Sequence, residues 1–324
     1  MKGFESFLAD KLEEFISYRE NLGLKNRRIR SYLRCFDRHI IGKKADWADF
    51  IPMFFLDFQD RIPGEKRTVN TILSAVHGFF QFLIRREYLA ENPLQDIPPR
   101  PENRFIPFIF APEKIEQLLL VIQERIRKTE QHFSRDYTVY MAILLIARCG
   151  LRISEPLRLH ISSYRYKERT IYIEKTKFHK DRLIPVQRDS ARELDNYLEL
   201  RQRFSKDNNR YLFPGIIKGR GLTENYIYPI FHQTVKGIGL ARQKQIVGTT
   251  TFGAPTVHSL RHSFAVNTLN SIKQRGIDPQ KGLPVLSAYM GHRKYSYTSL
   301  YLKMLDAEQR NNLVDFTISH QEEL

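Results

Sequence analysis

Two stretches near the start of the chain, residues 4–18 and 67–88, carry apolar side chains three or four positions apart. This spacing places the apolar residues along one face of an α-helix. Between them, residues 25–44 hold eight Lys or Arg and one acid, interleaved with apolar positions. That pattern predicts a helix with one face in a core and a basic face turned outward. We therefore expect a helical domain over residues 1–95.

A proline-rich stretch separates this region from the rest of the chain. Residues 92–108 contain five prolines and no apolar periodicity. Proline lacks a backbone donor and disfavours helix in the residue before it. We interpret residues 96–108 as a linker between the domain over residues 1–95 and a second domain over residues 109–324.

The second domain is predicted to be mostly helical with a small sheet. Helical periodicity covers residues 112–127 and 136–147 and resumes near Ser190. Residues 170–174 and 182–186 are rich in β-branched side chains and flank a polar stretch, which is typical of a β-hairpin. The sequence thus indicates a mainly α fold class with a small β-sheet.

The charge balance indicates a polyanionic partner. The chain has 52 Lys and Arg against 36 Asp and Glu, a formal net charge of +16. Residues 1–100 hold 17 bases and 14 acids, or +3, so +13 lies in the remainder. Nucleic acid is the favoured partner and an anionic membrane surface the alternative. The basic helix is either a solvated face or a DNA contact, with the candidates Lys25, Arg27, Arg28, Arg30 and Arg34.

Compartment and redox state follow from what the sequence lacks. No apolar run approaches the length of a membrane span, and acids interrupt the first 15 residues, where a signal peptide needs an apolar core. We expect a cytoplasmic protein without a membrane partner. Cys35 and Cys149 have neither a disulfide nor a metal-ligand spacing, and we interpret them as reduced thiols.

Four short segments hold residue types that act on phosphates. They are residues 147–159, 174–186, 258–264 and 290–303. In the first, Arg152 follows Gly150 at the predicted end of a helix, between apolar neighbours. An arginine held at such a bend is ready for a bidentate contact with phosphate, although a surface ion-pair residue is the alternative.

The next candidates are histidines and an arginine. His258 and Arg261 lie three residues apart, so one helix face can present both to one phosphate. A buried histidine beside an exposed arginine is the alternative, and we interpret the following His262 as a packing residue. His292 follows Gly291 after an apolar run, where a simple helix C-terminal cation is the alternative.

The nucleophile and the hairpin lysine remain open from residue type alone. The candidate nucleophiles, each also fit for aromatic packing, are Tyr295, Tyr297 and Tyr301. The lysines of the hairpin, which periodicity does not separate, are Lys175, Lys177 and Lys180. The sequence has neither Walker-type glycine and lysine spacing nor an acidic cluster for paired metals. We therefore expect no metal and no cofactor, so that the protein's own cations neutralise the phosphate.

Taken in order, the four segments resemble the tyrosine recombinase (phage integrase) family over nearly the whole chain. The family pattern G-L-R-x-S-E stands at residues 150–155, and H-x-L-R-H stands at residues 258–262. Gly291-His292 is followed by Tyr301 nine residues later. The hairpin pattern G-K-G-x-K-x-R-x-x-P stands at residues 176–185, with both glycines replaced, and this register selects Lys177.

The resemblance implies a fold and an activity. It implies an N-terminal helical core-binding (SAM-like) domain and an α+β catalytic domain. The enzyme would cleave DNA and exchange strands through a 3′-phosphotyrosyl intermediate, without metal or ATP. The long segment 270–284 resembles members encoded by transposons, which points to integration or transposition of a mobile element.

The resemblance also assigns roles to residues. Tyr301 is the nucleophile, although Tyr297 stands where the family has a threonine and is a rival. Arg152 and Arg261 clamp the phosphate, and Glu155 orients its neighbours. The remaining catalytic residues are His258 as general base, His292 as a phosphate hydrogen bond and Lys177 as proton donor to the leaving 5′-oxygen.

Partners and alternatives complete the expectation. The partners are double-stranded DNA recombination sites, three further copies in a homo-tetramer on DNA, and accessory recombination proteins, at the nucleoid of a bacterial cytoplasm. The tail, residues 306–324, either packs on its own domain or docks in trans on a neighbouring subunit. The alternative functions are DNA relaxation by a type IB topoisomerase-like enzyme and non-catalytic DNA-binding regulation.

Overall fold

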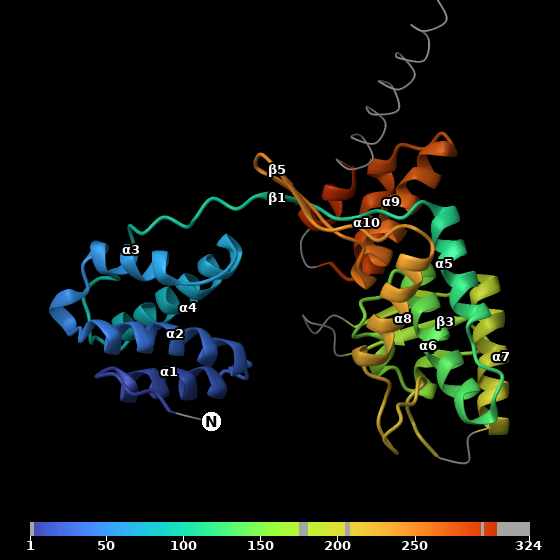
Figure 1. The fold of residues 1–324 in the computed structure, drawn as a ribbon, viewed down its shortest axis with the longest axis horizontal. Helices are drawn as coiled ribbons and strands as arrows, with labels where there is room; N and C mark the ends of the chain where they lie inside the picture. Colours follow the sequence, from blue (N-terminus) through green and yellow to red (C-terminus); the bar gives the residue numbers. More distant parts are fainter. Residues whose placement is uncertain (1–2, 175–180, 205–207, 293–294, 303–324) are drawn as a thin grey trace, which may run out of the picture. The chain divides into compact units, whose positions relative to one another are not determined.

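The computed structural model describes residues 3–174, 181–204, 208–292 and 295–302. The chain divides into two compact units, residues 1–103 and 104–324, which we describe separately (Figure 1). Lys175, Lys177 and Lys180, together with the tail over residues 306–324, lie outside the described residues.

Unit 1 is helical throughout its described elements. These are α1 (Ala9–Asn21), α2 (Arg27–Lys43), the 3-10 helix η1 (Trp47–Asp49), α3 (Pro52–Arg61) and α4 (Lys66–Arg85). The helices predicted from residues 4–18, 25–44 and 67–88 are confirmed as α1, α2 and α4. They enclose a core rich in phenylalanine, in which the fully buried rings are Phe36, Phe55, Phe58, Phe79 and Phe80.

The basic helix α2 is amphipathic, as its sequence indicates. Leu33, Phe36 and Ile40 face the core, while most of its basic side chains are at least partly exposed. Asp37, the one acid in the basic run, is buried and accepts hydrogen bonds from the backbone of Glu5 and Ser6 at 3.0 Å. Its carboxylate therefore ties the chain's start to α2.

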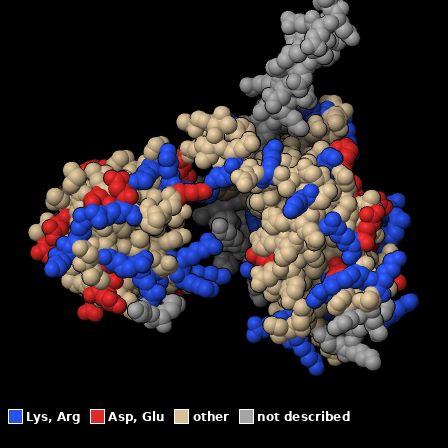
Figure 2. Space-filling view, in the orientation of Figure 1, with Lys and Arg blue, Asp and Glu red and all other residues tan. Residues whose placement is uncertain are grey.

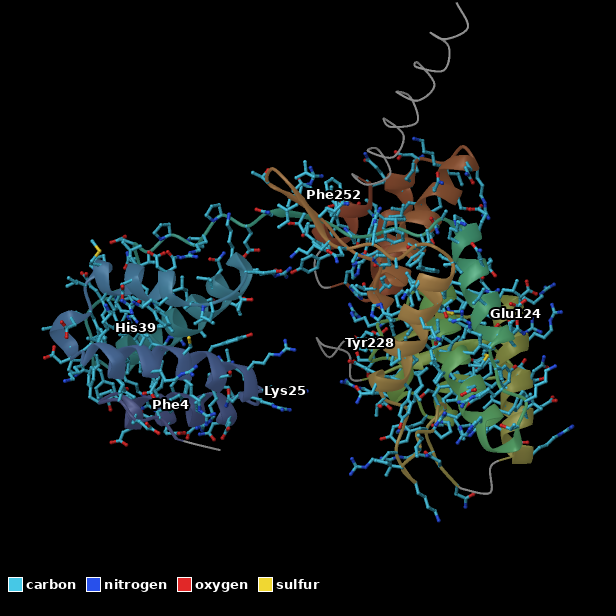
Figure 3. All side chains as sticks on the ribbon, in the orientation of Figure 1. Phe4, Lys25, His39, Glu124, Tyr228 and Phe252 are labelled. Carbon is cyan, nitrogen blue, oxygen red and sulfur yellow. The ribbon has the colours of Figure 1, made fainter. Side chains whose placement is uncertain are left out.

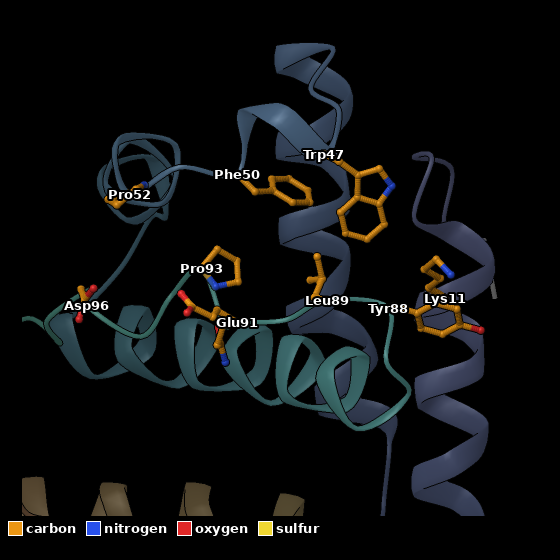
Figure 4. A pocket seen from close by; sticks show the side chains of 10 residues that line it. Lys11, Trp47, Phe50, Pro52, Tyr88, Leu89, Glu91, Pro93 and Asp96 are labelled. Carbon is orange, nitrogen blue, oxygen red and sulfur yellow. The ribbon is translucent and has the colours of Figure 1, made fainter.

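Unit 1 also has a surface cavity of about 650 Å³ (Figure 4). Its lining combines aromatic residues, including Trp47 and Phe50, with the acids Glu91 and Asp96. At one end, Nζ of Lys11 lies 3.3 Å from the centroid of the Tyr88 ring, a cation–π contact.

The stretch predicted as a linker is divided between the units. Within unit 1, the backbone N–H of Arg100 donates to Oδ1 of Asn70 at 2.8 Å, and Nδ2 of Asn70 donates to the Arg100 carbonyl at 2.9 Å. Within unit 2, Arg104–Ile106 forms strand β1. As expected, this proline-rich stretch contains no helix. The sequence did not predict its hydrogen bonds to Asn70 or the short strand β1.

Unit 2 combines α-helices with two small sheets. The helices are α5 (Pro112–Glu124), α6 (Glu130–Cys149), α7 (Arg188–Phe204), α8 (Glu224–Gly237), α9 (Val257–Gln274) and α10 (Pro279–Met290). Helix α6 contacts α5, α7, α8 and α9, and its residues 139–147 are all buried. A helix with apolar residues on all sides is stable only when it is surrounded in this way.

The predicted hairpin is confirmed, and a second sheet was not foreseen. Strands β3 (Thr170–Ile173) and β4 (Arg182–Pro185) pair antiparallel with Ile171 opposite Ile184, and β2 (Tyr164–Arg165) joins β3. The other sheet has the order β1-β6-β5, with β5 (Gln245–Val247) and β6 (Thr250–Phe252) antiparallel. Three-residue strands are too short for a period-two pattern to reveal them.

Two short 3-10 helices, η2 (Pro156–Arg158) and η3 (Ile161–Ser163), connect α6 to the first sheet. Among the described residues, no helix has the length and apolarity required to cross a membrane.

Glycines end the two helices that border the candidate site. Gly150 after α6 has φ 58° and Gly291 after α10 has φ 63°, in the left-handed region that favours glycine. A Cβ on Gly150 would lie 2.4 Å from the Phe264 ring. Both the backbone angle and the packing therefore require glycine where the chain turns towards Arg152.

We predict that Gly150→Ala destabilises the protein more than Gly276→Ala. Gly276, just after α9, has φ 75°, and a Cβ added there would meet nothing within 4 Å, so alanine costs about 1 kcal/mol of conformational energy. At Gly150 the clash with Phe264 adds about 1–3 kcal/mol. Urea denaturation of both variants measures the difference, and equal losses would show that the close contact with Phe264 is unimportant.

Candidate active site

Three guanidinium groups surround one buried carboxylate in unit 2. Glu155, which is 7% exposed, accepts hydrogen bonds from Nη1 of Arg152 at 2.9 Å and from both terminal nitrogens of Arg182 at 3.1 and 2.9 Å. Nη1 of Arg261 lies 3.9 Å from its Oε2. One negative charge faces three positive charges, so this buried cluster has an excess positive charge suited to an anion.

The electrostatics of Glu155 follow from these contacts. Burial alone would raise the pKa of the Glu155 carboxyl, but the hydrogen bonds and charge of Arg182, with Arg152 and Arg261, outweigh burial and hold that pKa below its usual value. The carboxylate is therefore ionised at neutral pH and orients the guanidinium groups.

The same arginines bind the carbonyl ends of two helices. Nη2 of Arg152 donates to the Gly291 carbonyl at 2.9 Å. Arg261, which is 2% exposed, donates at 2.6 Å to the carbonyls of Gly150 and Met290. Helix C-terminal carbonyls lack partners within their helix and carry partial negative charge. The arginines satisfy them and thereby bring the ends of α6 and α10 together.

Helix α9 supplies the histidine and arginine pair that the sequence predicts. Thr256 caps the helix with a reciprocal hydrogen-bonded pair to Ser259, which fixes the start of α9 just before His258. In Figure 1, α9 and α10 lie beside each other in the orange and red part of unit 2, and their contact is among the larger helix pairings. Arg261 and His258 therefore lie on a helix that already packs against α6 and α10.

The histidines around the cluster are held neutral. The ring of His258 contacts His262 edge to face, with centroids 4.5 Å apart. Burial lowers the pKa of His258 and of His292 to about 4, with Arg261 and Arg152 adding repulsion. Burial and the neighbouring His258 lower the pKa of His262 to about 3. At neutral pH each ring can accept a hydrogen bond as well as donate one.

Of the three candidate nucleophiles, Tyr301 is the one that lies at this cluster. It is 3% exposed, belongs to a helical stretch over residues 296–302 and joins an apolar cluster formed by α9 and α10. Its Oη lies 3.0 Å from Nδ1 of His262, and its ring stacks on His292 with centroids 6.2 Å apart. Burial raises the pKa of Tyr301, while the charges of Arg261 and Arg152 oppose that rise.

The two rival tyrosines have different surroundings. Tyr295 and Tyr297 are 51% and 53% exposed. Tyr297 reaches His292 only through a ring contact of 6.4 Å between centroids. Thr298, next to it, is fully buried and its hydroxyl lies 2.8 Å from Nδ1 of His292. This geometry favours Tyr301 over Tyr297 as the group beside the guanidinium cluster.

The basic candidates of unit 1 differ in their exposure and in their partners. Lys25, at the turn between α1 and α2 (Figure 3), is exposed, as are Arg27 and Arg28, whereas Arg34 is half-buried. Arg30 instead forms a bidentate pair with Glu13, with both distances 2.6 Å. On the faces visible in Figure 2, Lys and Arg side chains are more widespread than Asp and Glu.

Comparison with known proteins identifies the family. The phage integrase family model matches residues 110–308. A protein of Sinorhizobium fredii assigned as an integrase/recombinase, y4rB, is 31% identical over 301 residues, which are 92% of this chain and 93% of that protein. The chain belongs to the phage integrase family of tyrosine recombinases. This confirms the resemblance and the enzyme class predicted from the sequence.

Solved structures show that the recombinase also shares the family fold. The XerH site-specific recombinase bound to its difH substrate in a pre-cleavage complex is 19% identical, with a TM-score of 0.66 over 90% of this chain and 81% of that one. The Tn1549 transposon integrase in complex with a circular intermediate DNA is 18% identical, with a TM-score of 0.62 over 92% and 95%. The predicted fold class, mainly helical with small sheets, is thus confirmed.

The sequence did not predict the contacts that two residues of the recombinase, Arg182 and His262, make at this cluster. Arg182 lies at the start of β4, and its Nε also donates to the Tyr289 carbonyl at 2.8 Å, so it links the hairpin to α10. In the sequence it is only one member of the hairpin pattern. His262 was interpreted as a packing residue, yet it holds the Tyr301 hydroxyl. Its position four residues after His258 was the available signal, because that spacing puts both on one helix face.

The neutral histidines predict how the recombinase's stability depends on pH. An unfolded histidine has a pKa of 6.5, so between pH 6.5 and about 4 the unfolded chain binds protons that the folded chain does not. Stability is therefore retained above pH 6.5 and lost as the pH falls below it. For His258, His262 and His292 together, the slope approaches about 4 kcal/mol per pH unit.

Urea denaturation from pH 7 to pH 4.5 measures this slope. The variant His262→Asn should reduce it by about a third, or about 1.4 kcal/mol per pH unit. If the variant and the parent protein show the same slope, His262 is not held neutral in the folded protein.

Proposed function

We propose that this recombinase cuts and rejoins double-stranded DNA at specific sites, with Tyr301 as the nucleophile, in the integration or transposition of a mobile element. The observation that carries the proposal is the position of Tyr301: its hydroxyl lies 3.0 Å from Nδ1 of His262, its ring stacks on His292, and the charges of Arg261 and Arg152 act on it. The names of the relatives, an integrase/recombinase and a transposon integrase, support the mobile-element context.

The chemistry follows from the residue types. Oη of Tyr301 attacks the scissile phosphorus, the new P–O bond links the protein to the 3′ side, and the bond to the 5′-oxygen breaks. Charge that develops on the non-bridging oxygens is stabilised by Arg152 and Arg261, which Glu155 and the helix carbonyls hold in place before DNA binds. Because the phosphotyrosyl bond keeps the energy of the phosphodiester, rejoining needs no ATP.

Other residues complete the proposed site. His292 donates a hydrogen bond to the phosphate through the ring nitrogen that does not face Thr298. Lys177 protonates the leaving 5′-oxygen; β4, which follows it in the chain, begins with Arg182 in the cluster. We also assign His258, on which the charges of Arg261 and Arg152 act, a contact with the phosphate. Protein cations thus supply the charge stabilisation.

The assembly is part of the proposal. Unit 1 acts as the core-binding domain, unit 2 as the catalytic domain, and both contact the DNA backbone. Four copies assemble on paired recombination sites together with accessory recombination proteins, and the tail over residues 306–324 either packs on its own domain or docks in trans on a neighbouring subunit. The recombinase would work at the nucleoid, in the cytoplasm of a bacterium.

A covalent trap tests the nucleophile. The probe is a library of short duplexes with randomised sequence and a nick, from which the fragment with the 5′-hydroxyl diffuses away after cleavage. We expect a denaturation-resistant protein–DNA adduct with the parent protein and with Tyr297→Phe in the presence of EDTA, and none with Tyr301→Phe. Arg152→Ala should slow the reaction about 10²- to 10³-fold, as for the loss of a donor to a developing oxyanion.

Three outcomes would contradict the proposal. An adduct with Tyr301→Phe would transfer the role to another residue, and cleavage that needs a divalent ion and leaves no protein on the DNA would remove the mechanism. The absence of any adduct with the parent protein would indicate a DNA-binding regulator. With the selected site placed on plasmids, relaxation of a single plasmid without exchange between paired sites would indicate a topoisomerase.

The basic helix gives a second test, with a matched control on the same helix. Arg27→Ala should weaken binding to the selected duplex and reduce the slope of log affinity against log salt by about one unit, because one phosphate contact is lost. Arg30→Ala should leave that slope nearly unchanged, since Glu13 already neutralises its guanidinium. Fluorescence anisotropy across salt concentrations measures both. A reduced slope for Arg30→Ala alone would reverse the assignment.

A further inference from the structure

We propose that His262 is the catalytic base that takes the phenolic proton of Tyr301, a role that the family resemblance places on His258. The inference rests on the proposed function, since it concerns the same attack on phosphate. The inference depends on a contact that only the tertiary structure shows: a ring nitrogen of His262 lies beside the Tyr301 oxygen that attacks the phosphate.

The geometry of the pair is that of a nucleophile and its base. Nδ1 of His262 lies 3.0 Å from Oη of Tyr301, within the range expected for a general base and the proton it removes. The rings are inclined at 58°, with centroids 5.7 Å apart, so the contact is made through the ring nitrogen rather than by stacking. His262 therefore touches the reacting atom itself.

His258 is placed differently. It lies one helical turn before His262 on α9, and its ring meets that of His262 edge to face at 82°. The charges of Arg261 and Arg152 act on it, whereas those that act on His262 are His258, Arg261 and His292. From this position His258 supports the His262 ring and can donate to phosphate, while the Tyr301 hydroxyl is bonded to His262.

The protonation states match the direction of transfer. Burial, His258 and Arg261 lower the pKa of His262, and burial raises the pKa of Tyr301. At neutral pH the phenol is therefore protonated and the imidazole is neutral, so in the tautomer that carries its proton on Nε2 the Tyr301 O–H group donates to Nδ1 of His262. His292, whose ring stacks on Tyr301, is also neutral, and its Nδ1 lies 2.8 Å from the Thr298 hydroxyl.

DNA binding would strengthen this base. Among the groups that lower the pKa of His262 is Arg261, which belongs to the cluster proposed to bind the phosphate. A bound phosphate anion offsets that positive charge and raises the basicity of His262 when it is needed. Without DNA the base stays weak and Tyr301 stays protonated, which limits unproductive reaction of the nucleophile.

Protons and electron pairs balance in the proposed step. As Oη of Tyr301 forms its bond to phosphorus, its proton moves to Nδ1 of His262, which becomes an imidazolium ion. The electron pair of the breaking P–O bond leaves with the 5′-oxygen, which takes a proton from a separate acid, Lys177 in the proposed mechanism. In rejoining, the imidazolium returns its proton to Oη as the phosphotyrosyl bond breaks.

The variant His262→Asn separates a base from a positioning residue. The Asn amide oxygen can keep the hydrogen bond from Tyr301 at the place of Nδ1, but it cannot take the proton. With the duplex selected from the library, we expect single-turnover adduct formation to be about 10²- to 10⁴-fold slower at pH 7. The rate should rise with pH up to about pH 10, because hydroxide then replaces the missing base.

Two controls make the result specific. His258→Asn alters the neighbouring ring on the same face of α9, and it should lower the rate without adding this rise at alkaline pH. A duplex with sulfur in place of the leaving 5′-oxygen needs no acid, so it should rescue Lys177→Ala but not His262→Asn. In His262→Ala, added imidazole should restore part of the adduct rate, provided that thermal denaturation shows a folded protein.

The outcomes separate this inference from the proposed function. If the parent protein forms no adduct, the proposed function fails. If the parent reacts and His262→Asn reacts within about threefold of it, His262 only positions Tyr301 and the inference is overturned. It is likewise overturned if sulfur rescues His262→Asn, or if His258→Asn alone acquires the alkaline dependence. If His262→Ala does not fold, the adduct rate of His262→Asn decides between these outcomes.

Discussion

The buried carboxylate of Glu155, shared by three guanidinium groups, is the interaction on which the rest of unit 2 depends. It lies between the end of α6 and η2, and its partners come from β4, α9 and the turn after α6. These elements are far apart in sequence, and ionic hydrogen bonds hold them at defined positions. Removing the carboxylate would leave buried like charges without a counterion, which is strongly destabilising.

The excess charge of this cluster adds to burial in setting the protonation state of the histidines, and the proposed chemistry depends on it. Charges that are only partly compensated in a buried place act strongly on their neighbours, because little water screens them. Burial keeps His258 and His292 neutral and these charges add to its effect, while for Tyr301 the charges favour the ionised form against the effect of burial. In the proposed function this cluster is a preorganised site for the phosphate, and a bound phosphate would relieve the repulsion among its positive charges.

Much of the fold was predictable because helices such as α2 and α4 each carry an apolar stripe. α2 and α4 follow directly from their periodicity, and the β3–β4 hairpin follows from two β-branched runs around a polar turn. The β1-β6-β5 sheet was not predictable, since three-residue strands carry no usable pattern and β1 comes from a proline-rich stretch. The partition of that stretch depended on contacts such as the Asn70 and Arg100 bonds, which no local pattern encodes.

For the candidate site, the sequence by itself determined which residue types are present and in what order. Arg152, His258, Arg261, His292 and Tyr301 were chosen on motif spacing, and the structure brings all five together with Glu155. Only the tertiary structure decided which atoms meet: that Arg182 completes the cluster, that Arg30 is bound by Glu13, and that His262 faces Tyr301. The physical reason is that spacing along a helix specifies a shared face, whereas the partner of that face is decided by how α6, α9 and α10 pack.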